Sequence, residues 1–229
     1  VLSIWEFLNK KIKNIDPRVS AIAVTTVCLF AIPVNMAAQN WDDHNRHARY
    51  ATTAHARNYL NSCAPNAILF TYVQEVEGVR RDVRVVNLSL LSGSWYIDQM
   101  KRKAYESSGV PISFTHEQYR DGKRDYVLIR DQFKEGNLKD VMEFVASDLP
   151  QTKLQGYIKE LDFIPTRNVI LPVDSAKVIA NGTVKPQDAD QIVKDLRLHL
   201  PMQGLTKSQL MVLDILSTNN WERPVYFGI

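Results

Sequence analysis

The chain opens with a long run of apolar positions that no charge interrupts. Twenty residues, Val19 to Ala38, lack any charged side chain, and four basic residues precede them. At about 1.5 Å per residue, a helix of this length matches the roughly 30 Å hydrocarbon core of a bilayer. Basic residues favour the cytoplasmic side, and Trp41 on the other flank suits an interface. The pattern therefore predicts a transmembrane helix over 19–38, with the N-terminus inside and the rest of the chain outside.

Two other interpretations of this stretch are open. A buried core helix is an alternative, because Thr25, Pro33 and Asn35 are only moderately apolar. Proline inside a helix costs about 3 kcal/mol or more in water but is better tolerated within a membrane. A cleaved signal peptide fits less well, since the stretch is long and starts well inside the chain. Residues 1–18 have helical apolar spacing and form an amphipathic segment, either on the cytoplasmic membrane surface or ending a preceding element.

Beyond the apolar stretch, residues 39–229 show alternating strand and helix patterns. The runs 67–72 and 83–91 are almost continuously apolar, which is typical of strands buried on both faces of a parallel sheet. The sequence therefore predicts an α/β fold, a three-layer sandwich with a mainly parallel sheet, preceded by one transmembrane helix. Further strands are expected at 110–114, 126–129, 168–173 and 224–227. Helices are expected at 42–61, 94–105, 137–148, 187–199 and 206–219, and a hairpin at 177–184.

The connection between the first two strands is unusually short. Only residues 73–82 separate them, whereas a parallel crossover needs about a dozen residues or more. Either these strands pair unusually, or residues are missing between Tyr72 and Val73.

Composition and motifs argue against several classes of function. The net charge is only +3 and no basic stripe with interleaved aromatic residues is present, so nucleic acid is not an expected partner. Neither a phosphate-binding glycine loop nor a nucleophile or zinc-protease motif occurs. The two cysteines, Cys28 and Cys63, would lie in different environments and should not pair. No catalytic residue is assigned.

Two polar clusters are candidate binding sites. The first is Asp42, Asp43, His44 and Arg46, next to the far membrane interface. His44 and His47 could chelate a metal with Asp43, but a polar face meeting lipid headgroups explains the cluster without one, and no metal site is predicted. The second is Asn219, Asn220, Trp221 and Arg223, between the last helix and the last strand. Its structural interpretation is a helix C-cap, with Trp221 covering the edge of the core.

Four blocks of sequence carry a resemblance to a known family. They are Asn40–Arg46 (NWDDHNR), Pro65–Tyr72 (PNAILFTY), Asp82–Leu91 (DVRVVNLSLL) and Thr218–Phe227 (TNNWERPVYF). Together they resemble a family of large bacterial polytopic membrane proteins, known as a domain of unknown function. Members look like glycosyltransferases that use polyprenyl-phosphate-linked sugars and are related to protein O-mannosyltransferases. The chain departs from the family by lacking an acidic insertion after Tyr72.

The resemblance implies a setting for the chain. It would comprise the last transmembrane helix and the C-terminal extracytoplasmic domain of a bacterial inner-membrane protein, with that domain in the periplasm. A polyprenyl-phosphate-linked sugar would be the donor of the full-length protein, and the catalytic carboxylate would lie in the absent membrane half. The domain would then recognise an acceptor or partner, and its partners would be the lipid bilayer and an acceptor protein.

Two further functions stay open. One is a non-catalytic interaction subunit of a cell-envelope export or assembly complex. The other is a sugar- or nucleotide-binding domain that uses the acidic loop missing after Tyr72.

Overall fold

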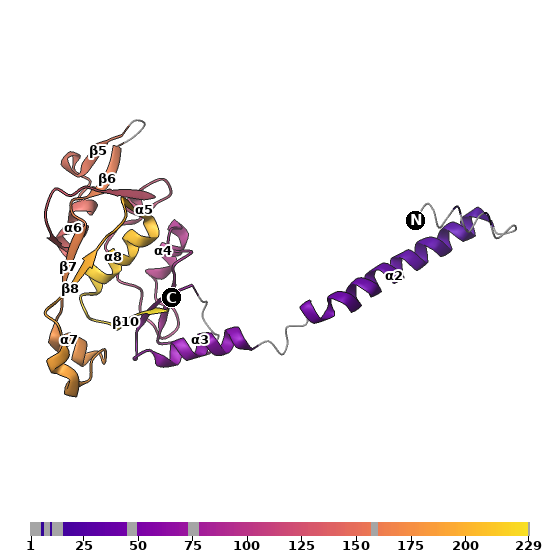
Figure 1. The fold of residues 1–229 in the computed structure, drawn as a ribbon, viewed down its shortest axis with the longest axis horizontal. Helices are drawn as coiled ribbons and strands as arrows, with labels where there is room; N and C mark the ends of the chain where they lie inside the picture. Colours follow the sequence, from indigo (N-terminus) through magenta and orange to yellow (C-terminus); the bar gives the residue numbers. More distant parts are fainter. Residues whose placement is uncertain are drawn as a thin grey trace. The chain divides into compact units, whose positions relative to one another are not determined.

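The computed structural model divides into two compact units, residues 1–52 and 53–229 (Figure 1). It describes residues 6, 10, 16–44, 50–72, 78–156 and 160–228, with only the backbone described at 42–44. The predicted division into residues 1–18, 19–38 and 39–229 depends on membrane placement and stays a prediction.

The first unit contains helix α2, Pro17–His44, which includes the whole uncharged stretch. Residues Pro17–Trp41 are long and apolar enough to cross a membrane by length and composition, and 0% of the apolar window is buried. This exposure disagrees with a buried core helix, and α2 is a candidate membrane span. Its exposed large apolar side chains are those of Val19, Ile22, Val27, Leu29, Phe30, Ile32, Val34, Met36 and Trp41.

The helix expected to start at Asp42 or Asp43 does not start there. Helix α2 continues to His44, and α3, Ala51–Ser62, is a separate helix. No glycine or proline follows Pro33 within α2, so nothing local ends the helix before the two aspartates.

A small parallel sheet forms one part of the second unit, with strand order β10-β1-β2. Its strands are β1 (Ile68–Thr71), β2 (Arg84–Asn87) and β10 (Val225–Gly228). Strand β1 pairs in parallel with both neighbours, so the short connection after Tyr72 does join parallel strands. Both faces of β1 are buried, as its continuous apolar sequence predicts.

Two further sheets have mixed strand directions. One has the order β5-β6-β3-β9 and the other β4-β7-β8. Pairs β3–β6 and β4–β7 are parallel, whereas β3–β9, β5–β6 and β7–β8 are antiparallel. The bounds are β3 Tyr126–Ile129, β4 Gly136–Asn137, β5 Lys153–Gln155, β6 Glu160–Ile164, β7 Asn168–Pro172, β8 Asp195–His199 and β9 Gly204–Thr206. The described chain is thus a mixed α/β fold with three small sheets, and the expected single, mainly parallel sheet is not formed.

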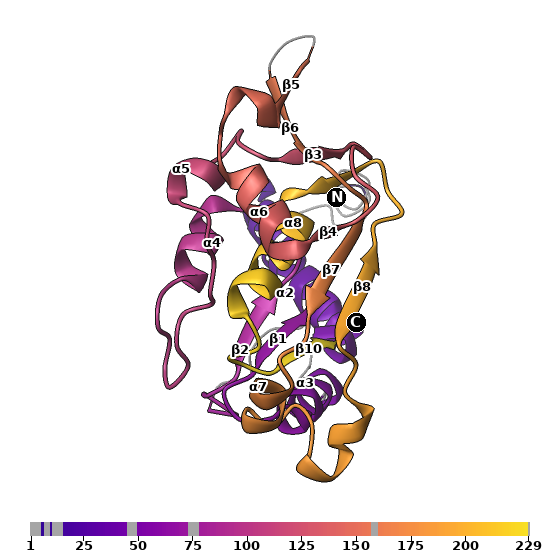
Figure 2. The same ribbon diagram turned by 90° about the vertical axis from the view of Figure 1, so that its left-hand side faces the viewer.

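Helices α6 and α8 pack together beside these sheets (Figure 2). Asn137 caps α6 by accepting a hydrogen bond from the Lys139 amide, and Thr206 with Gln209 forms a capping box at the start of α8. The α-helices of this part are α4 (Ser94–Met100), α5 (His116–Tyr119), α6 (Leu138–Ala146), α7 (Ser175–Ala180) and α8 (Lys207–Asn219). Two 3-10 helices are η1 (Pro150–Thr152) and η2 (Pro186–Gln191).

A large hydrophobic core joins the sheets to α4, α6 and α8, with Phe70, Phe114 and Leu210 fully buried at its centre. A smaller cluster that includes Leu60, Leu69 and Val85 lies between α3 and the other face of the parallel sheet. In both views the β5–β6 hairpin and α7 lie at opposite ends of this unit (Figures 1 and 2).

Three expected elements are absent at their predicted places. Residues 110–114 belong to no strand, because the Ser113 amide donates to the Asp214 side chain and not to a ladder. The hairpin at 177–184 is instead α7 with its terminal turn, in which Gly182 has a φ of +82°. The helix at 187–199 is instead η2 followed by strand β8, whose Leu196 and Leu198 alternate with polar residues.

Candidate functional site

The main candidate site is a cleft beside α6 and α8, which we call the interhelix cleft. Its volume is about 730 Å³. Fourteen residues line it: Ser113, Thr115, Gln118, Asn137, Lys139, Met142, Glu143, Ala146, Ser147, Leu171, Pro172, Ser217, Thr218 and Asn220. Most of the polar groups are neutral hydroxyls and amides, so the cleft suits a ligand that is recognised through hydrogen bonds.

A buried carboxylate fixes two of these hydroxyls. Asp214 of α8 is 0% exposed. It accepts hydrogen bonds from the Ser113 hydroxyl, from the Ser113 amide at 2.9 Å, and from the Thr218 hydroxyl at 3.4 Å. Burial raises the pKa of Asp214, while these hydrogen bonds act in the opposite direction. Since both hydroxyls donate to Asp214, their oxygens are left to accept hydrogen bonds from a ligand in the cleft.

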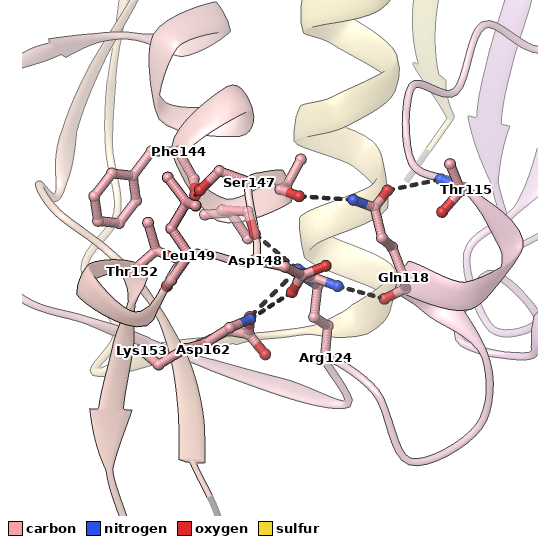
Figure 3. Close-up of polar contacts among 12 residues, drawn as sticks. Thr115, Gln118, Arg124, Phe144, Ser147, Asp148, Leu149, Thr152, Lys153 and Asp162 are labelled. Carbon is pink, nitrogen blue, oxygen red and sulfur yellow. Dashed lines mark hydrogen bonds and ion pairs between the residues drawn. The ribbon is translucent and has the colours of Figure 1, made fainter.

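Gln118 closes one side of the cleft by joining two elements. Its amide nitrogen donates to the Ala146 carbonyl at 2.6 Å, and its oxygen accepts from the Thr115 amide at 2.8 Å. Figure 3 shows the side chain between the Thr115 loop and the C-terminal end of α6. The end of α6 and the start of α5 are therefore held at a fixed separation.

Behind Gln118 lies an ion-pair network, shown in Figure 3, which we call the Arg124 network. The Arg124 side chain is 1% exposed and donates to the Gln118 and Val145 carbonyls at 2.8 Å each. It also lies 2.6 Å from Asp148 and 3.4 Å from Asp162. Lys153 bonds the same two carboxylates. Two cations thus face two anions, and the network ties the β5–β6 hairpin to the end of α6.

The electrostatics of Asp148 reflect this network. Burial alone would raise the pKa of Asp148, but the charges and hydrogen bonds of Lys153 and Arg124 outweigh it and lower the pKa. Both Arg124 and Asp148 have left-handed backbone, with φ values of +49° and +53°. Such φ values are uncommon for residues other than glycine, so the ion pair joins two strained positions.

The predicted cluster at 219–223 is mostly structural. Asn220 is the left-handed C-cap of α8, and the half-buried Trp221 donates to the Pro172 carbonyl at 2.6 Å, which agrees with the C-cap interpretation. Asn219 donates to the Arg223 carbonyl, and Arg223 is 6% exposed. Asn220 lines the interhelix cleft, whereas Trp221 lines a separate apolar hollow of about 470 Å³ near α7. The structure therefore brings one of these four residues to the cleft.

The predicted cluster next to the membrane lies largely outside the described side chains. Asp42, Asp43 and His44 occupy the last residues of α2, where only the backbone is described, and Arg46 and His47 lie outside the described residues. Within the part of the chain that is described, no group of three or more His, Cys, Asp or Glu side chains could hold a metal ion. The cluster stays a prediction.

Sequence reasoning missed most of the cleft and the whole Arg124 network. Ser113 and Asp214 are 101 positions apart, so no local pattern joins them. One available signal was Asp214 itself, because a carboxylate between Leu213 and Ile215 interrupts the apolar residues of α8 and must find partners if it is buried.

These features define the class of the molecule: a mixed α/β domain of three small sheets with a neutral cleft, following one candidate membrane span. Residues 52–229 match the family model described as TMEM260-associated domain 2, and the chain belongs to this family. Comparison with curated proteins gives no match. Comparison with solved structures gives none either.

Proposed function

We propose that residues 39–229 form the extracytoplasmic recognition domain of a membrane glycosyltransferase-like protein, and that the interhelix cleft binds an extended segment of the acceptor protein. The observation that carries the proposal is the cleft of about 730 Å³ with its neutral hydrogen-bonding lining. An extended peptide presents amide N–H donors and carbonyl acceptors without net charge, which the Ser, Thr, Asn and Gln side chains match.

The charge of the cleft supports a neutral ligand. Its two charged lining residues, Lys139 and Glu143, have opposite signs and lie 3.9 Å apart on one face of α6. Their charges therefore largely cancel at a distance, so the charged lining residues favour neither an anionic nor a cationic ligand. The hydroxyl oxygens that Asp214 orients would accept hydrogen bonds from peptide N–H groups.

The setting of the proposal comes from the sequence. The resemblance of the four blocks supports a glycosyltransferase-like parent protein in the bacterial inner membrane, with this domain in the periplasm and a polyprenyl-phosphate-linked sugar as the donor. The candidate span at Pro17–Trp41 supports attachment to the lipid bilayer. In this proposal the domain presents the acceptor, and bond formation takes place in the membrane portion.

The test is peptide binding by the full chain in detergent micelles, followed through backbone amide chemical shifts. An unstructured peptide rich in Ser and Thr is the probe, and a neutral oligosaccharide and a nucleoside diphosphate are added in parallel experiments. We expect the peptide to shift amides around the cleft. Ser217→Ala and Asn220→Gly should weaken binding, whereas Ser92→Ala, which removes an exposed hydroxyl outside the cleft, should not.

Other results would direct the proposal elsewhere. Binding of the oligosaccharide or nucleotide at residues flanking Tyr72, without peptide binding, would favour the sugar- or nucleotide-binding alternative. Stable copurifying envelope proteins, without sugar transfer by the full-length protein, would favour the interaction subunit. Peptide binding that Ser217→Ala and Asn220→Gly leave unchanged would contradict the cleft assignment.

A further inference from the structure

A second, much smaller cavity lies beside the first residue of β2, and we call it the arginine cavity. Arg80, Arg81, Arg84, Tyr105 and Ser107 line it, together with apolar side chains from α3 and β2. About 20 Å³ is open to the centre of a water-sized sphere, which is room for one small group and too little for a nucleoside. The interhelix cleft shares no lining residue with this cavity.

Arg84 is the buried cation of this cavity. The residue is 3% exposed, and its Nη2 donates to the Gln99 carbonyl at 3.0 Å. Its Nε has no hydrogen-bond partner among the described residues. A buried N–H that is part of a cation is costly to leave unpaired, so the Arg84 guanidinium has an unmet requirement for an acceptor.

Arg223 adds a second buried cation nearby. Its guanidinium donates to the Asn66 carbonyl at 2.8 Å, to the Ala67 carbonyl at 3.3 Å and to the Ser107 hydroxyl at 3.0 Å. Ser107 therefore connects Arg223 to the cavity that Arg84 lines. Burial, together with the nearby charge of Arg84, lowers the pKa of Arg223 to about 10.

The charge of this region is not balanced within the described residues. No described carboxylate forms an ion pair with Arg84 or Arg223, and Asp82 is paired with Arg80 at 2.9 Å. Buried charges are normally paired, and the described residues supply no counter-ion for these two like charges, so the region would accommodate an anion.

The mouth of the cavity carries a further cation. Arg81 is exposed and lies over the exposed Tyr105 ring, with its guanidinium carbon 4.5 Å from the ring centroid. The segment from Tyr105 to Gly109 closes against the end of α4. A Cβ at Gly109 would lie 2.1 Å from the Lys101 carbonyl oxygen, so glycine is required for this approach.

We propose that the arginine cavity binds a small tetrahedral oxyanion of the phosphate type, either free or as the end of a phosphomonoester. Arg84 is its buried anchor, and Arg81 is the cation at the entrance. Arginine suits this ligand because its planar fork matches the geometry of phosphate oxygens. The proposal does not depend on the acceptor-binding function.

The test measures binding of inorganic phosphate to the full chain in detergent by calorimetry and by the shift in Tm, with chloride at matched ionic strength as the control. Phosphoserine is titrated in parallel to separate a free anion from a phosphomonoester. We expect phosphate to raise the Tm and chloride to leave it unchanged, because a ligand that binds only the native state stabilises it.

Three arginine variants make the test specific. Arg84→Met should weaken phosphate affinity by roughly tenfold or more, because it removes a charge-assisted hydrogen bond. Arg81→Gln changes an exposed residue, so folding is preserved and a smaller loss is expected. Arg197→Gln, an exposed arginine on β8, is the matched control and should bind like the parent.

Two results would overturn the proposal. In the first, neither phosphate nor phosphoserine changes the Tm or the calorimetric trace of the parent protein. This result would mean that water alone occupies the cavity. The other is phosphate binding of equal affinity in Arg84→Met, Arg81→Gln and Arg197→Gln, which would place the anion elsewhere. Binding of phosphoserine but not of phosphate would identify the ligand as a phosphomonoester.

Discussion

Two regions of the domain bury arginine in opposite ways. Arg124 and Arg223 are both almost fully buried, and both donate hydrogen bonds to backbone carbonyls. Arg124 also faces Asp148 and Asp162, so its network is electrically balanced. Arg223 has Arg84 as its charged neighbour and no described carboxylate in an ion pair. The two regions therefore differ in charge balance: described carboxylates neutralise Arg124, whereas in our proposal a bound anion neutralises Arg84 and Arg223.

The largest effect should come from removing the balanced cation. Arg124→Met leaves the Gln118 and Val145 carbonyls without their donor and leaves Asp148 and Asp162 to share Lys153. We expect a loss of about 3–5 kcal/mol in the free energy of unfolding, as for one partner of a buried ion pair. Urea unfolding of the full chain, followed by tryptophan fluorescence, measures it. A loss below about 1 kcal/mol, similar to that of exposed surface changes, would contradict a structural role for the network.

Arg223→Met should have an intermediate effect. The substitution leaves several carbonyls unpaired, but it also removes one of two uncompensated charges. We expect a loss of about 1–3 kcal/mol in phosphate-free solution, the cost of unsatisfied buried acceptors. The same unfolding experiment applies, with Arg197→Gln as the control. If the loss equalled that of Arg124→Met, the two regions would not differ as we infer.

Low pH should weaken the Arg124 network. The pKa of Asp148 is lower in the folded chain than in the unfolded chain, so its contribution is present above the ordinary Asp range and is lost as pH falls. Because Asp148 is about half exposed, solvent screens it, and we expect less than about 1 kcal/mol. Unfolding at pH 7 and at about pH 3 measures the difference between the parent and Asp148→Asn. The variant should lose less stability on acidification, and an equal loss would contradict the assignment.

The smallest effect should come from Arg84→Met. Replacing an uncompensated buried cation with an apolar side chain removes a desolvation cost and one hydrogen bond to Gln99. We expect a change within about 1 kcal/mol in either direction when phosphate is absent. A loss comparable to that of Arg124→Met would show that Arg84 is already paired in the protein.

Local signals in the sequence explain what was predicted correctly. The strands at 68–71, 126–129 and 168–172 follow from short apolar runs, and the starts of α6 and α8 follow from Asn137 and from Thr206 with Gln209. Each signal lies within a few residues of the element that it specifies. The type of each of these elements could therefore be predicted without information about tertiary contacts.

The misses come from signals that have two meanings. The hairpin expected at 177–184 would have Asn181-Gly182 as its turn, but the left-handed glycine follows α7, which Asp174 caps. A glycine with positive φ serves both a turn and a helix C-terminus, so the dipeptide alone does not decide. The alternation of Leu196, Leu198 and polar neighbours was visible at β8, yet a helix was predicted there.

The candidate sites depend on contacts between distant residues. The cleft needs Ser113 beside Asp214, and the network needs Arg124 beside Asp148 and Asp162. Strand order and helix packing create these contacts, and neither can be read from a local pattern. Of the predicted binding residues, Asn220 lines the cleft, while Arg223 belongs to the region of the arginine cavity.

The pairing of β1 with β10 has a consequence for biosynthesis. Ile68 lies opposite Val225, so the central strand of the parallel sheet receives one of its two neighbours only after residues 72–224 have been made. Because the chain is synthesised from its N-terminus, this sheet cannot form strand by strand during synthesis. Until residues 225–228 arrive, one edge of an apolar strand is unpaired and open to aggregation. During this interval of synthesis the nascent domain is prone to aggregation, and a chaperone that covered the unpaired edge would have its largest effect then.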